Sequence, residues 1–385
     1  KARNQGGSFH CWGMALPQRI LFPPEVICMD WQQRQRPGAG LCNLGSTCYI
    51  NVILQCLTYT PPLANYLLSR DHSHRQGFCM MCVMEAHVRK VLRSSASVIR
   101  PRAVVRDLKF IGEEFEPDMA GDAYEFLRCA LEAMQRACLN GRRDVDISSP
   151  TTTIIHQIFG GILKSRVTCL TCQAVSDSYK AFLHVLLDIK VRGLVIVLQD
   201  IPKCEKRVTA SKRVTVHHVP KVFTVCLERA ADHTGKKISK IVEYPEYLDL
   251  RPYMSDIAGE PLLYSLYALV VHSGDTCLDG HFFCYTKAGN GLWYKMDDES
   301  VDNCGSCVQN TFPFPDFAVC LLILLGVSVI GGNSSLGRPA VSGQVLQGCT
   351  VSLVGLCWCT ARGQVPRRKS STNPRSGAMI TPAGL

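Results

Sequence analysis

One cysteine of this chain stands where its thiol could act as a nucleophile. Cys48 follows Gly45 and two hydroxyl residues, and it begins an apolar pattern with helical spacing that runs through Leu57 and ends before Pro61. The first turn of a helix presents unpaired N–H groups and the positive end of the helix dipole, which stabilise a thiolate. Asn43, five residues upstream, could add a side-chain amide beside the backbone N–H of the cysteine, where an oxyanion would develop. The alternative is simple packing, because the chain has 21 cysteines and a buried thiol usually serves as a small apolar side chain.

A cysteine nucleophile also needs a base and a group that orients the base. His281 opens a strand pattern, and Asn290-Gly291 follows it as a strong hairpin signal. The returning strand ends in two acids, Asp297 and Asp298. The sequence therefore predicts a hairpin that brings a carboxylate close to an imidazole.

The register of this hairpin decides which residue faces the first acid. A two-residue turn would set Asp297 opposite Cys284, and a four-residue loop would set it opposite Phe282. In either register the carboxylate lies within a residue or two of His281 across the ladder. The arrangement would let Asp297 hold the imidazole in one tautomer. The competing interpretation is a surface hairpin with a chance histidine and two solvated acids.

The elements that must position these residues change in type along the chain. Helical patterns occupy the first half and strand patterns the second, which favours an α+β domain. One expected helix is capped by Ser46 or Thr47, runs through Leu57 and stops before Pro61, and two others cover residues 79–96 and 122–138. The expected strands are Val214–His218, Phe223–Leu227, Leu263–His272, His281–Thr286 and Leu292–Met296.

Charge and cysteine usage exclude several classes. The net charge of +10 over 385 residues could indicate nucleic-acid binding. However, Phe317 to Leu385 contains six Lys/Arg and no acid, so the other residues carry only about +4. This favours a solvated tail over a nucleic-acid partner. An odd number of cysteines without a signal-peptide pattern argues against a secreted disulfide framework and favours a reducing compartment, nucleus or cytoplasm.

The composition divides the chain into three parts. Residues 1–39 are rich in Pro and Gly and form a lead-in, residues 40–314 form the main domain, and residues 315–385 form a divergent, largely disordered tail. Near the start of the tail, Phe317–Ile330 is an apolar run of 14 residues. A membrane helix needs roughly 20, so a buried segment is favoured over a membrane span.

Two segments resemble the motifs of the ubiquitin-specific proteases. GLCNLGSTCYINVILQCL, from Gly40 to Leu57, resembles their cysteine box, and GHFFCYTKAGNGLWYKMDDESV, from Gly280 to Val301, resembles their histidine box. TPPLANYLLSRDHS, HQIFGGILKSRVTCLTC and EYPEYLDLRPYMS, which lie between the boxes, resemble one branch of that family. The resemblance implies an α+β, papain-like fold with a palm, a thumb and fingers.

The resemblance also implies a role for each matching residue. Cys48 would be the nucleophile, His281 the base, Asp297 its orienting acid, Asp298 a second polar support and Asn43 the oxyanion donor. The implied reaction is thiol-dependent hydrolysis of the bond after the C-terminal glycine of ubiquitin, and it needs no cofactor.

The same resemblance assigns two acids to substrate binding. Asp122 and Glu125, in GDAYEF, match the family's QEDAHEF segment and would meet the basic residues near the end of ubiquitin. The implied partners are ubiquitin and ubiquitinated proteins, bound by a monomer, with no nucleic acid and no membrane.

The family's zinc site is degenerate in this sequence. Four cysteines normally form two C-x-x-C pairs, but here Cys169 and Cys172 form one pair and Cys204 remains alone, with Ile201 in the other position. Only 13 residues separate Lys190 from Cys204, which predicts shortened fingers. We therefore expect zinc to be absent or weakly held, unless His217 or His218 replaces the lost ligand.

Other departures from the family leave two functions open. Ala120 stands for the Gln of QEDAHEF, Ala230 for a core Phe and Val52 for a Ser, and no segment after Val301 resembles the closing family strand. The pairs Cys79/Cys82 and Cys304/Cys307 are expected to be packing or free thiols. The first function is a deubiquitinase, and the alternative is an impaired ubiquitin-binding pseudoenzyme or unstable remnant.

Overall fold

The structure, a computed structural model, describes residues 27–32, 36–69, 77–139, 153–189, 195–200, 204, 207–229, 236–238, 242, 245–277, 280–305 and 318–327. Its helices are α1 Cys48–Thr58, α2 Pro61–Ser69, α3 Met80–Arg93, α4 Arg102–Arg106, α5 Leu108–Ile111, α6 Ala123–Leu139, α7 Ile154–Phe159 and the 3₁₀ helix η3 Arg251–Tyr253. Its strands are β1 Gly40–Leu41, β2 Val98–Ile99, β3 Gly161–Cys169, β4 Val175–Phe182, β5 Val185–Asp188, β6 Val195–Asp200, β7 Arg207–His218, β8 Val222–Glu228, β9 Tyr247–Asp249, β10 Leu263–Ser273, β11 His281–Lys287, β12 Trp293–Asp297, β13 Ser300–Gly305 and β14 Ala318–Val327.

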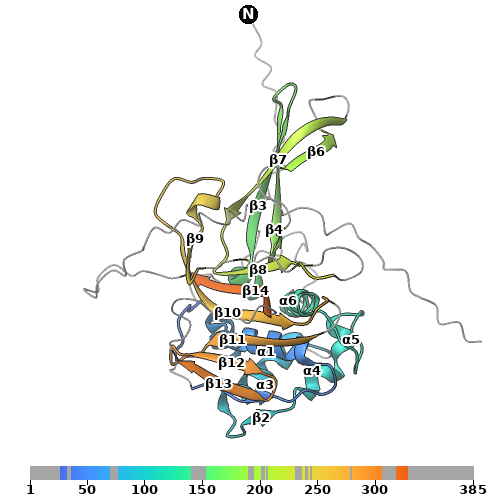
Figure 1. Ribbon diagram of the computed structural model, residues 1–385. Coiled ribbons are helices and arrows are strands. Elements are labelled where there is room, and N and C mark those ends of the chain that lie inside the picture. Colours follow the sequence, from blue (N-terminus) through green and yellow to red (C-terminus); the bar gives the residue numbers. More distant parts are fainter. Residues whose placement is uncertain are drawn as a thin grey trace, which may run out of the picture.

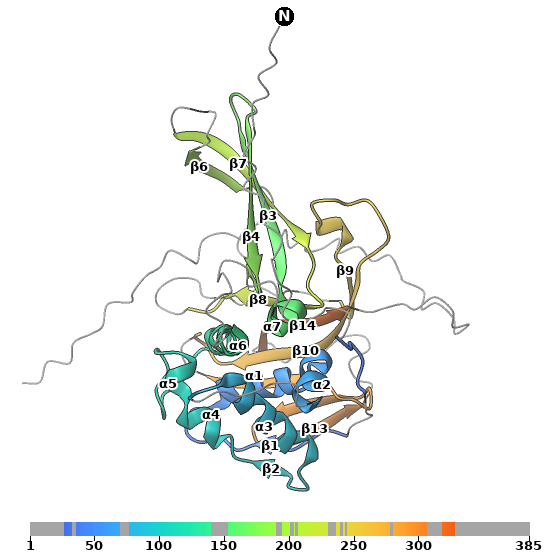
Figure 2. The same ribbon diagram turned by 180° about the vertical axis from the view of Figure 1, so that it is seen from behind.

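The described strands form two large sheets and one small one. The central sheet has the order β13-β12-β11-β10-β14-β8-β5, with β9 also paired to β10. In Figure 1 strands β10–β13 lie in front of α1 and α3, and Figure 2, seen from behind, shows these helices covering that face. The second sheet, β4-β3-β7-β6, extends away from the helices and the central sheet (Figures 1 and 2). We call it the finger sheet.

Helix α1 lies at the centre of the fold. All of its residues are buried, because it packs against β11 and β12 on one side and against α2 and α6 on the other. Two of its residues are amides four positions apart, Asn51 and Gln55. They donate to the backbone carbonyls of Leu41 (3.3 Å) and Ala39 (3.1 Å). This helix therefore fixes the extended segment that leads into Cys48.

The elements expected from the sequence patterns are present. The three expected helices correspond to α1, α3 and α6, and the five expected strands lie in β7, β8, β10, β11 and β12. The boundaries differ by a few residues; β7 alone is much longer than expected, because it runs the length of the finger sheet.

The expectation that the closing strand is missing is wrong. Ala318–Val327 forms β14, which pairs antiparallel with β10 on one side and with β8 on the other. An apolar run without a family motif can fill this position, because the ladder needs backbone N–H and C=O groups and not a particular sequence. The range expected to be a tail therefore contributes a strand to the middle of the central sheet.

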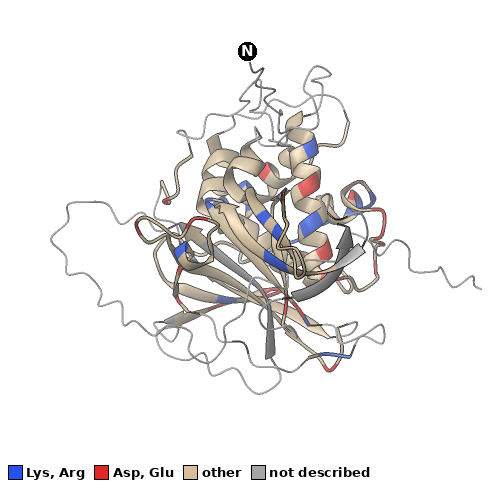
Figure 3. Ribbon diagram, turned by 90° about the horizontal axis from the view of Figure 1, so that it is seen from above, with Lys and Arg blue, Asp and Glu red and all other residues tan. Residues whose placement is uncertain are grey.

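Two further observations concern partners. Within the ranges given above, no helix is both long enough and apolar enough to cross a bilayer. Figure 3 shows acidic and basic residues interspersed over the described elements in that view.

Candidate active site

A short loop with two left-handed residues leads into the N-terminus of α1. Gly45 has φ 97° and Ser46 has φ 50°, so a glycine at position 45 permits the tight entry that the sequence indicated. Thr47 is the N-cap residue but makes no side-chain cap bond. Its hydroxyl instead accepts from the Leu44 N–H at 2.9 Å. The first-turn N–H groups beside Cys48 are therefore not taken up by this side chain. The Cys48 residue itself is only 8% exposed.

His281 lies at the start of β11, next to Cys48 and Asp297. Its Nε2 is 2.5 Å from Asp297 Oδ1, which leaves Nδ1 as the ring nitrogen for the thiol. The hydrogen bond with Cys48 raises the pKa of His281; partial burial lowers it, and the bond with Asp297 raises it further, to about 9. These three side chains thus form one chain of contacts, from Cys48 through His281 to Asp297.

A glycine is needed immediately before this histidine. Gly280 has φ 150°, and a Cβ atom there would lie 2.3 Å from the Ser273 carbonyl oxygen. The close approach lets β11 begin directly against the end of β10, where Ser273 pairs with His281.

The hairpin register differs from both registers that the turn signal allowed. Lys287 pairs with Trp293 and Cys284 with Met296, so the ladder direction places Asp297 beside Phe283. Side chains two residues apart share a face of a strand. Asp297 and His281 are therefore diagonal neighbours on one face, whereas either expected register would have put them on opposite faces.

Asp298 occupies a different place from the one expected. It lies in the turn after β12 with φ 48°. Its Oδ2 accepts from Asn43 Nδ2 and its Oδ1 from Asn51 Nδ2, both at 2.8 Å. Its backbone carbonyl accepts from the Leu41 N–H, also at 2.8 Å. Asp298 thus ties the sheet to the segment before Cys48, and its carboxylate is not directed at His281.

The side chain of Asn43 organises the same loop. Its Oδ1 accepts from the backbone N–H groups of Gly45 and Thr47, both at 3.1 Å. Its Nδ2 has two hydrogens, one of which goes to Asp298. Sequence reasoning did not single out Asn51, the other amide on Asp298. The signal was present, since a polar side chain inside a fully apolar helix pattern must find a partner.

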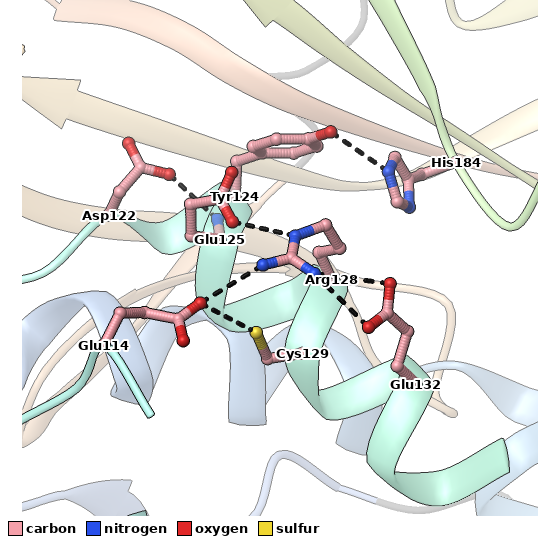
Figure 4. Close-up of polar contacts among 8 residues, drawn as sticks. All are labelled: Glu114, Asp122, Tyr124, Glu125, Arg128, Cys129, Glu132 and His184. Carbon is pink, nitrogen blue, oxygen red and sulfur yellow. Dashed lines mark hydrogen bonds and ion pairs between the residues drawn. The ribbon is translucent and has the colours of Figure 1, made fainter. Parts of the chain in front are cut away.

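The two acids assigned to the substrate lie at the start of α6 (Figure 4). Asp122 Oδ1 accepts from the Glu125 N–H at 2.9 Å, so Asp122 acts as a helix cap. Glu125 Oε2 accepts from Arg128 Nε at 2.8 Å. Arg128 also pairs with Glu114 and Glu132.

This group of charges remains acidic although it contains one cation. Figure 4 shows the carboxylates of Glu114, Glu125 and Glu132 around the guanidinium of Arg128, and a fourth carboxylate, that of Asp122, at the start of the helix. At neutral pH, four negative charges and one positive charge leave a formal charge of −3. The surface at the start of α6 therefore suits a basic ligand.

Three cysteines meet in the finger sheet. The sulfurs of Cys169, Cys172 and Cys204 lie within 4.8 Å of one another, and they form the one group of this kind among the residues described. Cys172 Sγ is 3.4 Å from Cys204 Sγ. The three thiols could supply three ligands to a tetrahedral ion.

The histidines considered as replacement ligands lie elsewhere. Ala210 of β7 pairs with Cys169, but His218 pairs with Ile162, near the other end of β3. Eight residues of strand correspond to about 26 Å. The expectation that His217 or His218 could complete the site is therefore wrong.

The remaining departures have mixed placements. Ala120 is exposed before α6, as expected for a position near a substrate. Ala230, Ile201 and Cys307 lie outside the described residues. The cysteines whose side chains the structure describes, Cys79, Cys82 and Cys304 included, form no disulfide among the described residues.

Comparison with known proteins finds human proteins that are similar to about three quarters of this chain. The human (Homo sapiens) protein ubiquitin carboxyl-terminal hydrolase 42 is 50% identical over 307 residues, which are 75% of this chain and 23% of that protein. Human ubiquitin carboxyl-terminal hydrolase 17-like protein 6 is 43% identical over 309 residues, which are 76% of each. Several other 17-like proteins match over 57% of their own length, so the chain spans only part of most of these relatives. The branch indicated by the internal segments, that of hydrolases 36 and 42, agrees with the first comparison.

A solved structure supports the fold independently. The SAGA Ubp8/Sgf11/Sus1/Sgf73 DUB module bound to ubiquitin aldehyde superposes with a TM-score of 0.64 at 21% identity, covering 78% of this chain and 72% of that chain. The α+β, papain-like fold is thereby confirmed. The family profile described as ubiquitin carboxyl-terminal hydrolase matches residues 39–316, and with half of the aligned residues identical to a human member, this chain belongs to the ubiquitin carboxyl-terminal hydrolase family.

Proposed function

We propose that this chain is a thiol-dependent deubiquitinase, which hydrolyses the peptide or isopeptide bond after the C-terminal glycine of ubiquitin. The observation that carries the proposal is the contact chain from Cys48 through His281 to Asp297 at the N-terminus of α1. A nucleophile, a base and an orienting acid in contact are the parts that acyl transfer by a cysteine requires.

The geometry assigns a task to each side chain. His281 takes the thiol proton, so that the Cys48 sulfur attacks the glycine carbonyl as a thiolate. The carbonyl oxygen becomes an oxyanion, which the Cys48 N–H and the second amide hydrogen of Asn43 would stabilise. His281 then donates its proton to the leaving lysine amine, and water releases ubiquitin from the acyl-enzyme. Asp297 holds the imidazole throughout.

The acidic start of α6 suits the proposed substrate. The segment of ubiquitin before its terminal glycines is basic, and the surface around Asp122 and Glu125 keeps a net negative charge. The solved structure of the DUB module was obtained with ubiquitin aldehyde, which supports ubiquitin as the ligand of this fold. We propose a monomer without nucleic-acid or membrane partners, located in the nucleus or cytoplasm; Arg367-Arg368-Lys369 supports the nucleus.

The test is covalent labelling by ubiquitin with a C-terminal electrophile, followed by turnover of isopeptide-linked diubiquitin. Labelling of the folded chain at Cys48 supports an enzyme. Absence of labelling with retained ubiquitin binding would instead establish the pseudoenzyme. The missing closing strand was one argument for the pseudoenzyme, and it no longer applies, because β14 occupies that place in the sheet.

Isopeptide turnover should fall as the pH rises through about 9. The pKa of His281 is raised to about 9 by its bonds with Cys48 and Asp297. The imidazolium that protonates the leaving amine is therefore present below this pH and is lost above it, about tenfold per pH unit. Rates of diubiquitin cleavage and of Cys48 alkylation by iodoacetamide should be measured from pH 7 to 10. Alkylation has no amine to protonate, so a parallel fall of both rates would contradict the assignment.

Zinc should contribute little to stability. Catalysis in this site uses no metal, and three thiolates leave one position of a tetrahedral ion to water. If free zinc is near its dissociation constant, its removal costs about 0.4 kcal/mol, or roughly 1–2 °C in melting temperature. Melting with and without EDTA should be compared for the natural chain, for Cys204→Ser and, as a matched control, for Cys304→Ser. Stoichiometric zinc and a shift above about 5 °C would show a complete site.

A further inference from the structure

The catalytic acid has a second partner that the reaction scheme does not use. Asp297 Oδ1 is bonded to His281 Nε2, and Asp297 Oδ2 is 2.8 Å from Lys295 Nζ. The Lys295 ammonium also lies 4.6 Å from the centroid of the Phe283 ring. The carboxylate is thus held at both oxygens, by the imidazole on one side and by an ammonium on the other.

The strand places this lysine where it can reach the acid. Lys295 and Asp297 are two residues apart on β12, so they share the face that also carries His281 and Phe283 of β11. Tyr285 lies directly opposite Lys295 on β11, and Asp302 lies opposite it on β13. Partial burial lowers the pKa of Lys295, but the bond to Asp297 and the nearby charges, including that of Asp302, raise it overall and favour the ammonium form.

A carboxylate bonded through one oxygen can turn about the bond to its Cβ. Such a turn would exchange the two oxygens and swing the acceptor away from the imidazole N–H. An ammonium on the second oxygen opposes the turn, and the contact with Phe283 restrains the ammonium in turn. The Lys295 side chain is 34% exposed and the Asp297 side chain 27% exposed, so water competes with the pair and the lysine acts mainly through orientation.

We infer that Lys295 is a positioning residue of this site, which holds Asp297 Oδ2 so that Oδ1 stays on His281 Nε2. The inference rests on the proposed function of Cys48, His281 and Asp297. It adds a fourth residue to the chain of contacts, one that touches neither the substrate nor the reacting sulfur. Misplacement of a catalytic group by about 1 Å costs on the order of a hundredfold in rate, and a partly restrained acid should lose less, on the order of tenfold.

The experiment compares four single variants, one of them Asp297→Ala, and one double variant. Lys295→Met removes the ammonium with little change of shape, and Lys295→Arg keeps a cation in the same place. Lys287→Met is the matched control, since Lys287 lies on the same face of β11 at its far end, opposite Trp293. The rate of labelling by the ubiquitin probe should fall about tenfold in Lys295→Met, recover in Lys295→Arg and stay unchanged in Lys287→Met. In an Asp297→Ala background, Lys295→Met should have no further effect.

A second readout does not depend on activity. In the Cys48→Ala chain, the proton on His281 Nε2 should give a low-field proton NMR resonance because it lies in a short bond to a carboxylate. The resonance should weaken or disappear in Lys295→Met and persist in Lys295→Arg and Lys287→Met.

The outcomes separate the two proposals. Equal labelling rates for Lys295→Met and Lys287→Met, or an undiminished tenfold loss in the Asp297→Ala background, would overturn the positioning role. If the natural chain shows no labelling while the resonance still responds to Lys295, the proposed function fails and the positioning of Asp297 stands. If neither the resonance nor the labelling rate changes in Lys295→Met, the inference is wrong.

Discussion

Cys48→Ala should abolish labelling of this chain by a ubiquitin with a C-terminal electrophile. The probe reaction forms a bond to one sulfur, and Cys48 is the thiol at the N-terminus of α1 that contacts His281. Labelling should be followed by the mass of the intact chain and by peptide mapping. Cys56→Ala is the matched control: it removes another buried thiol from the same helix, so its labelling should persist.

The base should matter almost as much as the nucleophile. His281→Ala removes the group that takes the thiol proton, and the labelling rate should fall on the order of 10²–10⁴-fold. His281 is partly exposed, so its loss should leave the fold intact. Equal melting temperatures of His281→Ala and the natural chain would show that slower labelling does not come from unfolding. Labelling at another cysteine, or an unchanged rate in His281→Ala, would refute the assignment of this pair.

Asp297→Ala should cost up to about 10⁴ in rate, the scale of losing the orienting acid of a catalytic triad, but no more than His281→Ala, because the acid acts through the imidazole. The neighbouring acid was expected to substitute in part, which would have made this variant mild. The structure reverses that expectation, because both carboxylate oxygens of Asp298 are bonded to the amides of Asn43 and Asn51. The carboxylate of Asp298 is therefore held by these amides and is not free to turn toward the imidazole in place of Asp297.

Asp298→Ala provides the contrast. Its loss breaks two bonds from amides to a charged acceptor. The part-buried bond from Asn51 contributes about 1.5–3 kcal/mol, and the exposed bond from Asn43 contributes less. We expect a lower melting temperature and slower labelling, whereas Asp297→Ala should slow labelling with little change in melting. A mild Asp297→Ala together with an unchanged melting temperature in Asp298→Ala would show that the two acids are interchangeable.

The residues of the site could be predicted from local patterns, but their contacts could not. The start of a helical pattern identified Cys48, and the start of a strand pattern before a hairpin signal identified His281, since both signals are local in the sequence. The pairing of His281 with Asp297 depends on the exact register of a hairpin. Turn chemistry alone allowed two registers, each of which differs from the observed one by one residue, and one residue decides the face.

Contacts between residues that lie far apart in the sequence could not be predicted either. Asn51 and Lys295 are ordinary residues in their own elements, and their roles appear only when the turn at Asp298 and the carboxylate of Asp297 come close. The same holds for β14, whose sequence resembles no family strand. Its place follows from two edges that need a partner, and those edges exist only once the sheet is assembled.

The position of β14 has a consequence for how this protein acquires its structure. It is the last described strand in the chain, yet it lies between β10 and β8. Until β14 has left the ribosome, the edges of β10 and β8 that it will join carry unpaired N–H and C=O groups. Such edges can pair with strands of other chains. The nucleophile and the base are synthesised earlier, but the sheet that holds the base cannot close around them. Nascent chains should therefore need protection from aggregation until residues 318–327 have been synthesised and β14 fills the gap.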